Sequence, residues 1–179
     1  TWLDNASYGT TNSGVQSLLT GDNNKSSWNV DASYAGIANT ATSLSYSFQE
    51  IGAYFDNGDG LTQIDGGFSA TAKDFIRSVF ANFSSVANIT YTENTSQDIA
   101  GADIRLFAGT HTTLGSDPTT LGFAYQPYGS TTAGFDYEGN FFCITDSTGM
   151  DSLINTPFSS EYGDERNTIS HELGHAMGL

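Results

Sequence analysis

Apolar positions recur at helical spacing in the middle of the chain. Ser69 is a residue type that favours helix N-caps, and apolar side chains follow it three or four residues apart. These side chains are Ala72, Phe75, Ile76, Val79, Phe80 and Phe83. Because this spacing places them on one face, the segment predicts one long amphipathic helix whose aromatic stripe packs on a sheet.

Segments on both sides of this helix have the pattern of strands. Residues 44–48 alternate apolar and polar side chains, which is the period of a half-buried strand. Residues 89–93, 102–107 and 141–145 are also strand-like. A long helix between strands requires a crossover connection, so we expect a mixed sheet.

The segment from Leu121 to Tyr128 predicts a strand at the edge of that sheet. Its apolar residues are followed by Pro127, which cannot donate a backbone hydrogen bond and is therefore confined to sheet edges. The exposed backbone of an edge strand can accept an extended peptide.

A second helix is expected at the end of the chain. Ile169, Leu173 and Met177 form an apolar stripe at helical spacing, and acidic residues within 161–165 suit the N-terminal end of a helix. The predicted fold class is therefore α+β, a twisted mixed sheet with an edge strand and two long helices. At 179 residues the chain is long enough for a single domain.

The charge balance excludes some partners. With 20 acidic and 5 basic residues the formal net charge is -15, so nucleic acid and membrane surfaces are not expected to bind the chain. This acidity is typical of an exported protein, although a salt-adapted intracellular protein has the same balance. The sequence has no run of about 18 apolar residues, and residues 1–5 lack the features of a signal peptide. We expect a soluble chain from which any export segment has been removed.

Cysteine contributes little to the predicted chemistry. Cys143 is the single cysteine of the chain, so no intramolecular disulfide can form. Its neighbours Phe141, Phe142 and Ile144 are apolar, which predicts a buried and inert thiol.

The last nine residues contain the pattern H-E-x-x-H-x-x-G. His171 and His175 lie one turn apart on one face of the predicted helix, so both imidazoles can reach one metal ion, for which zinc is the natural occupant. Glu172 projects beside that ion, where its carboxylate can take a proton from water that attacks a peptide carbonyl. The alternative is a solvated helix face, but two of the 3 histidines stand at ligand spacing, which favours the metal site.

Three further features have simpler explanations. Gly178 suits a sharp turn back toward the metal, but an ordinary glycine C-cap is an equal alternative. His111 lies in a polar stretch predicted to be a loop, where a solvated histidine is favoured over a third zinc ligand. Residues 56–60 resemble part of a calcium loop but lack the spacing and the distal glutamate of an EF-hand, so a surface turn is favoured.

Taken in order, several segments resemble the serralysins, which are secreted bacterial zinc endopeptidases of the metzincin group. The resemblance covers most of the chain and is most specific in residues 161–163 and 168–179. The other matching segments are residues 18–21, Trp28, and residues 44–48, 67–70, 87–93, 102–105 and 124–127.

By this resemblance, residues 1–179 are the N-terminal part of one catalytic domain, a metzincin-type upper subdomain with a backing helix and an active-site helix. His171 and His175 would be zinc ligands, Glu172 the catalytic base and Gly178 the turn glycine. The family's third zinc histidine, methionine turn, tyrosine ligand and calcium-binding repeat domain lie downstream and are absent from this sequence. Calcium is therefore expected in the full-length protein.

The resemblance also implies a substrate site and an activity. Phe123, Ala124, Tyr125 and Gln126 would form the edge strand that pairs with the substrate backbone. The implied function is that of a secreted, extracellular bacterial zinc metalloendopeptidase with broad specificity for polypeptide substrates. The downstream part of the same protein, as a separate chain, is a candidate partner. Two alternatives stay open, namely an inactive fragment that binds a partner or inhibitor through its edge strand, and another metzincin of the matrixin-like or astacin-like type.

Overall fold

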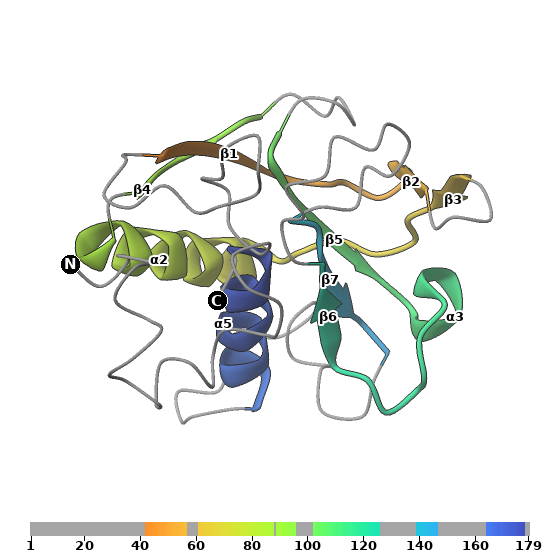
Figure 1. Ribbon diagram of the computed structural model, residues 1–179. Coiled ribbons are helices and arrows are strands. Elements are labelled where there is room, and N and C mark those ends of the chain that lie inside the picture. Colours follow the sequence, from red (N-terminus) through yellow and green to blue (C-terminus); the bar gives the residue numbers. More distant parts are fainter. Residues whose placement is uncertain are drawn as a thin grey trace, which may run out of the picture.

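The computed structural model of the protein describes residues 42–56, 61–87, 89–95, 102–125, 139–146 and 164–177. Two long helices and a five-stranded sheet dominate these stretches (Figure 1). In chain order the elements are β1 (Thr42–Phe48), β2 (Tyr54–Asp56), β3 (Leu61–Gln63), α2 (Ala70–Val86), β4 (Ile89–Glu93), β5 (Ile104–Gly109), α3 (His111–Leu114), β6 (Gly122–Ala124), β7 (Phe141–Ile144) and α5 (Asp164–Ala176).

The main sheet is mixed and mostly parallel. Its strand order is β4-β1-β5-β7-β6. The pairs β1–β4, β1–β5 and β5–β7 are parallel, whereas β6 runs antiparallel to β7. The chain passes from β1 through α2 before it returns as β4 beside β1, which is the crossover that the sequence predicts. The prediction that β6 lies at a sheet edge is also confirmed.

Helix α2 forms where its apolar spacing predicts. The Ser69 hydroxyl accepts a hydrogen bond from the Ala72 N–H at 3.2 Å, so it caps the first turn. The predicted stripe is the buried face: Ala72, Ile76, Val79 and Phe80 are buried, with exposed fractions from 0% to 6%. Stacking of Phe80 on Tyr46, with ring centroids 4.3 Å apart, joins the helix to β1.

The central strands β5 and β7 are buried on both faces, because α2 and α5 cover one face and a smaller cluster covers the other. Alternate residues of β5 and β7 point to opposite sides, which is the period of a strand. Leu106, Phe141 and Cys143 join the core beneath α2 and α5. Phe107 and Phe142 join a second cluster with Phe55, Ile64, Leu114 and Ile144. A strand buried on both faces reads as a continuous apolar run, which explains residues 141–144.

Strands β2 and β3 escaped the prediction from sequence. They pair antiparallel on either side of the suspected calcium loop, with Asp56 opposite Leu61. Residues 57–60 lie outside the described part of the chain, so the choice between a turn and a calcium loop stays a prediction. Residues 18–21 and Trp28, which carry part of the resemblance, also lie outside it.

The loop predicted around His111 is wrong. Residues 111–114 form the one-turn helix α3, because the Thr110 hydroxyl accepts from the Thr113 N–H and Gly115 ends the turn with φ of 68°. The prediction for Cys143 is confirmed, since the thiol is 1% exposed and burial raises its pKa to about 12. No helix in the described stretches is long and apolar enough to cross a membrane.

One charged cluster ties α2 to the strand that follows it. The Arg77 guanidinium donates to both carboxylate oxygens of Glu93, at 2.8 and 2.9 Å, and the Tyr46 hydroxyl donates to the same carboxylate at 3.3 Å. The hydrogen bonds from Arg77 hold the pKa of Glu93 below its usual range, although partial burial opposes them. Arg77 also pairs with Asp74, whose side chain is 74% exposed.

This cluster generates a prediction for stability against pH. Because the pKa of Glu93 is lower in the folded state than in the unfolded one, its contribution is complete above about pH 4.3 and is lost as the pH falls through the folded pKa. Glu93→Gln should therefore lower the free energy of unfolding by about 1 kcal/mol at pH 7 and by much less near pH 3. Urea unfolding at both pH values measures the difference.

The control for this measurement is Asp74→Asn, which removes an exposed partner of the same arginine. It should change the free energy of unfolding by less than about 0.5 kcal/mol. An equal loss for Glu93→Gln at both pH values would contradict the assignment of the pKa shift to the folded state.

Candidate active site

His171 and His175 converge on α5. Their Nε2 atoms lie 3.0 Å apart, and their rings stand at 83° with centroids 4.5 Å apart. Two imidazole nitrogens that lie so close need one atom between them, either a shared proton or a metal ion. Tetrahedral zinc with bonds of about 2.0–2.1 Å would separate its two nitrogen ligands by roughly 3.3 Å, so a small rotation of either ring accommodates it. The pair therefore fits zinc.

The buried face of α5 determines where these histidines point. Ile169 and Leu173 are fully buried and Met177 is 6% exposed, as the predicted stripe requires. The two histidines lie on a different face, and the His171 side chain is 61% exposed. The helix thus turns its apolar side to the core and presents the two ring nitrogens at the surface.

Glu172 lies beside the histidine pair in a less exposed position. Its side chain is 16% exposed, and its Oε1 atom is 4.0 Å from Nε2 of His171. Burial raises the pKa of Glu172 above its usual value, while the charges of His175 and His171 and a hydrogen bond from the Ala124 backbone oppose this rise. A carboxylate with a raised pKa, next to a place where a metal can bind, is suited to accept a proton near neutral pH.

The edge strand β6 lies next to Glu172 of α5. Leu121 and Tyr125 flank β6. The Leu121 carbonyl accepts from Ile144 of β7, and the Tyr125 N–H donates to the carbonyl of Asn140, the residue before β7. Bonding alternates along an antiparallel pair, so Gly122 and Ala124 direct their N–H and C=O groups to the outer edge. The Ala124 N–H donates to the Glu172 carboxylate. The structure therefore brings together His171, His175, Glu172 and Ala124 of the predicted site.

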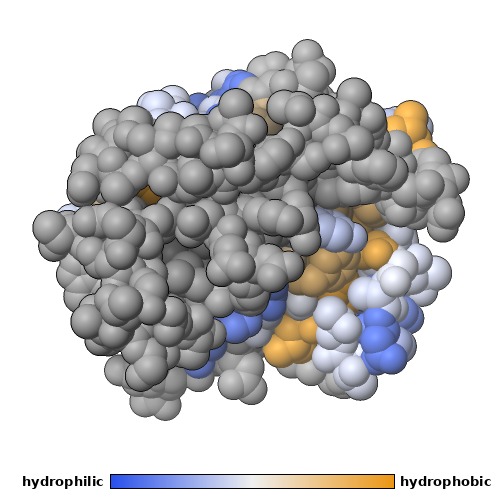
Figure 2. Space-filling view, viewed as in Figure 1, coloured by the Kyte–Doolittle hydropathy of each residue, from blue (hydrophilic) through white to orange (hydrophobic). Residues whose placement is uncertain are grey.

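The other predicted residues of the edge strand have a different setting. Phe123 stacks on Phe142 with centroids 4.7 Å apart, and Tyr125 meets both rings edge-on at 6.0 Å. The Phe123 ring therefore belongs to the cluster on the sheet face opposite α5. Figure 2 shows hydrophobic surface in the region of β6, next to hydrophilic surface in the region of α5. Gln126 lies outside the described residues.

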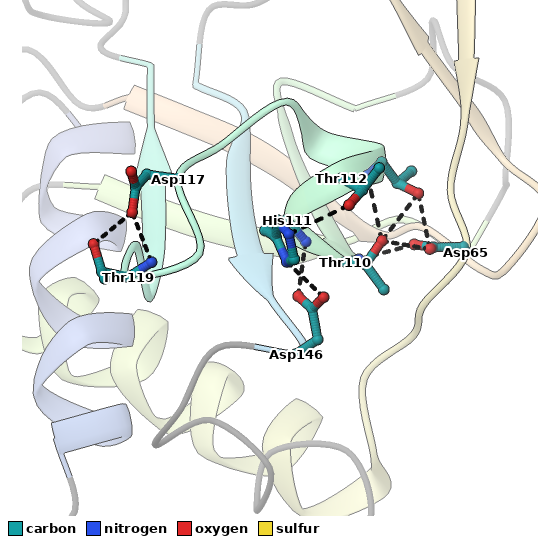
Figure 3. Close-up of polar contacts among 8 residues, drawn as sticks. Asp65, Thr110, His111, Thr112, Asp117, Thr119 and Asp146 are labelled. Carbon is teal, nitrogen blue, oxygen red and sulfur yellow. Dashed lines mark hydrogen bonds and ion pairs between the residues drawn. The ribbon is translucent and has the colours of Figure 1, made fainter.

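His111 lies apart from the histidine pair. Its Nδ1 is 2.6 Å from Oδ2 of Asp146, and its backbone N–H donates to Oδ1 of the same side chain at 2.7 Å (Figure 3). Strands β6 and β7 separate α3 from α5 in Figure 1. Asp146 therefore holds the first residue of α3, while Asp65 holds Thr110 and Thr113 through their hydroxyl groups. These contacts are structural.

A third metal ligand is not found in the described part of the chain. Among those residues, no group of three or more histidine, cysteine, aspartate or glutamate side chains could hold a metal ion. Gly178, the predicted turn glycine, lies outside them.

Gly122 also lies at this site, although the sequence pattern did not single it out. It lies in β6 next to Thr168 and Glu172 of α5. A glycine inside a predicted strand often marks the close approach of another part of the chain, and that signal was present in the segment from Leu121 to Tyr128.

Comparison with known proteins extends this description. No family model matches the chain. Over 112 residues it is 34% identical to metallopeptidase AprA of Pseudomonas marginalis, a match that covers 63% of this chain and 20% of AprA. The crystal structure of myroilysin aligns with 94% of this chain and 57% of its own at 15% identity, and its TM-score of 0.39 is too low to support a statement about fold or function. The chain thus spans about a fifth of the length of a metallopeptidase that it resembles in sequence.

Proposed function

We propose that the chain is the N-terminal part of a zinc metalloendopeptidase. The observation that carries this proposal is the convergence of His171 and His175, with their Nε2 atoms 3.0 Å apart, beside the half-buried carboxylate of Glu172. The sequence similarity to metallopeptidase AprA supports it independently.

The residues have separate roles in this proposal. His171 and His175 would hold zinc, which would supply a Lewis acid for the peptide carbonyl and for water. The Glu172 carboxylate accepts the proton of the attacking water and later returns it to the leaving amine. Its partial burial and the hydrogen bond from Ala124 keep the carboxylate in one orientation for both transfers.

The substrate is proposed to be an extended polypeptide that pairs with the outer edge of β6. An added strand would bond to the outward backbone groups of Gly122 and to the Ala124 carbonyl. Since α5 lies against β6, this pairing would bring a peptide bond next to Glu172. The aromatic side chains of Phe123 and Tyr125 would stabilise β6 from the opposite face.

The proposal also covers the type of metallopeptidase and its location. The resemblance to serralysins implies a metzincin upper subdomain, broad specificity, secretion from a bacterium and calcium bound elsewhere in the full-length protein. The net charge of -15 agrees with export. Because a catalytic zinc normally has three protein ligands, the third ligand would come from residues outside those described or from a downstream segment.

Of the two alternatives, only the first differs from this proposal in its prediction for zinc. A fragment that only binds a partner or inhibitor through β6 would not hold zinc stoichiometrically. A matrixin-like or astacin-like metzincin would keep the same ligands and the same base.

Zinc binding should depend on His175 but not on His111. His175→Ala removes a ligand, so zinc affinity should fall more than about 100-fold, since the loss of a mere supporting partner costs 10–100-fold. His111→Ala is the matched control, because this histidine contacts Asp146 instead. Zinc content after dialysis against a competing chelator measures both. Equal zinc loss in the two variants would contradict the assignment.

Glu172→Gln separates catalysis from metal binding. The amide cannot accept the proton, so peptide hydrolysis by the full native polypeptide should fall by about 10²–10⁴-fold while the zinc content stays unchanged. Turnover and zinc are measured on the same sample. Retained turnover would remove Glu172 from the mechanism.

Ala124→Pro tests the edge strand. Proline deletes the N–H that bonds to Glu172, so activity should fall about 10- to 100-fold, equivalent to a hydrogen bond to a charged group. Phe123→Leu, which keeps the backbone and an apolar side chain, should lower activity much less. Initial rates on a casein substrate compare them, and equal rates for the proline variant and the unchanged protein would exclude a role for this backbone.

A further inference from the structure

We propose that Gly122 is a positioning residue for the catalytic base. Its lack of a side chain lets β6 pack closely against both β7 and α5, which brings the Ala124 N–H to the Glu172 carboxylate. This inference rests on the proposed function, because Glu172 is a catalytic base only within that proposal.

The space around Gly122 carries the inference. A Cβ atom at this position would lie 2.9 Å from the Phe142 backbone oxygen, 3.5 Å from Cγ2 of Thr168 and 3.7 Å from Cγ of Glu172. The two contacts with α5 are ordinary van der Waals distances, whereas the contact with the β7 carbonyl is too short. Since a backbone carbonyl cannot rotate away as a side chain can, β6 itself would have to move.

The backbone conformation of Gly122 does not explain the glycine. Its φ lies outside the left-handed region that favours glycine, so an alanine could adopt the same backbone angles. The requirement is therefore one of space. Glycine in a strand interior weakens the strand, so its presence here calls for a physical reason, and the lack of space supplies one.

A displacement at Gly122 would be transmitted to the base. Gly122 and Ala124 point the same way, two residues apart along β6. Thr168 and Glu172 are one turn apart on the face of α5 that meets this strand. Because Ala124 donates to Glu172, a shift of β6 by a few tenths of an ångström changes the length and direction of that hydrogen bond.

The same geometry links substrate binding to the base. The outward N–H and C=O of Gly122 and the C=O of Ala124 face an incoming peptide, while the Ala124 N–H is already bonded to Glu172. A peptide paired at Gly122 would thus lie next to the Glu172 carboxylate, and β6 would hold both the peptide and this carboxylate in place. Gly122 sets the distance between the peptide-binding edge and the proton acceptor.

The test compares Gly122→Ala with Gly67→Ala in the full native polypeptide. Gly67 is the matched control, because a Cβ atom there would meet the Ile51 side chain at 3.5 and 4.0 Å, which are ordinary contacts. Hydrogen exchange of the Ala124 amide, measured by NMR in the zinc-free protein, reports the bond to Glu172 without any activity assay. Zinc content, kcat and KM are then measured on the zinc-loaded protein.

Gly122→Ala should speed exchange of the Ala124 amide by about tenfold. It should also lower kcat about tenfold or more at unchanged zinc content. Gly67→Ala should change neither. Unchanged exchange and unchanged kcat in Gly122→Ala would overturn the inference. Should this variant fail to fold, exchange in Glu172→Ala decides, because an Ala124 amide that is as protected there as in the unchanged protein has no bond to Glu172.

The outcomes separate this inference from the proposed function. If the unchanged polypeptide hydrolyses no peptide but Gly122→Ala still speeds the exchange of Ala124, the proposed function fails and the packing relation stands. If the unchanged polypeptide is an active zinc peptidase and Gly122→Ala matches Gly67→Ala in every measurement, only the role of Gly122 is wrong.

Discussion

The burial of one face of α5 against the sheet is the constraint on which the rest of the site depends. Ile169 and Leu173 are completely buried in the core shared with α2, and each such side chain contributes roughly 1.5–3 kcal/mol relative to an exposed one. This fixes the rotation of the helix about its axis. Since side chains four residues apart share a face, fixing Ile169 and Leu173 also fixes the direction of His171 and His175.

The second constraint is the close contact between α5 and the edge strand. An antiparallel strand at the end of a parallel sheet offers backbone groups on its outer side, and here one of them bonds to Glu172. The Glu172 carboxylate is therefore held by the backbone of the strand that is proposed to receive the peptide. The glycine at 122 makes that approach compatible with the β7 carbonyl. The three residues of β6 thus take part in the packing against α5, in the polar contact with Glu172 and in the proposed binding of the peptide.

Much of this arrangement is predictable from local patterns. The apolar stripe after Ser69 predicted α2, the alternation at residues 44–48 predicted β1, and Pro127 pointed to an edge strand. The spacing of His171 and His175 predicted their convergence. Patterns of this kind could not predict which strands are neighbours, because the order β4-β1-β5-β7-β6 depends on contacts between distant segments. They also missed α3, whose single turn forms because Asp65 and Asp146 hold it from remote parts of the chain. The bond from Ala124 to Glu172 could not be predicted either, because these two residues are far apart in the sequence.

The proposed function depends on a zinc ion held by His171 and His175 beside Glu172. The most direct measurement is an anomalous-difference map at the zinc absorption edge from crystals of the full native polypeptide grown with zinc. One strong peak should appear about 2.0–2.1 Å from Nε2 of both histidines. A peak elsewhere, or zinc in solution but no peak between these two nitrogens, would contradict the proposal.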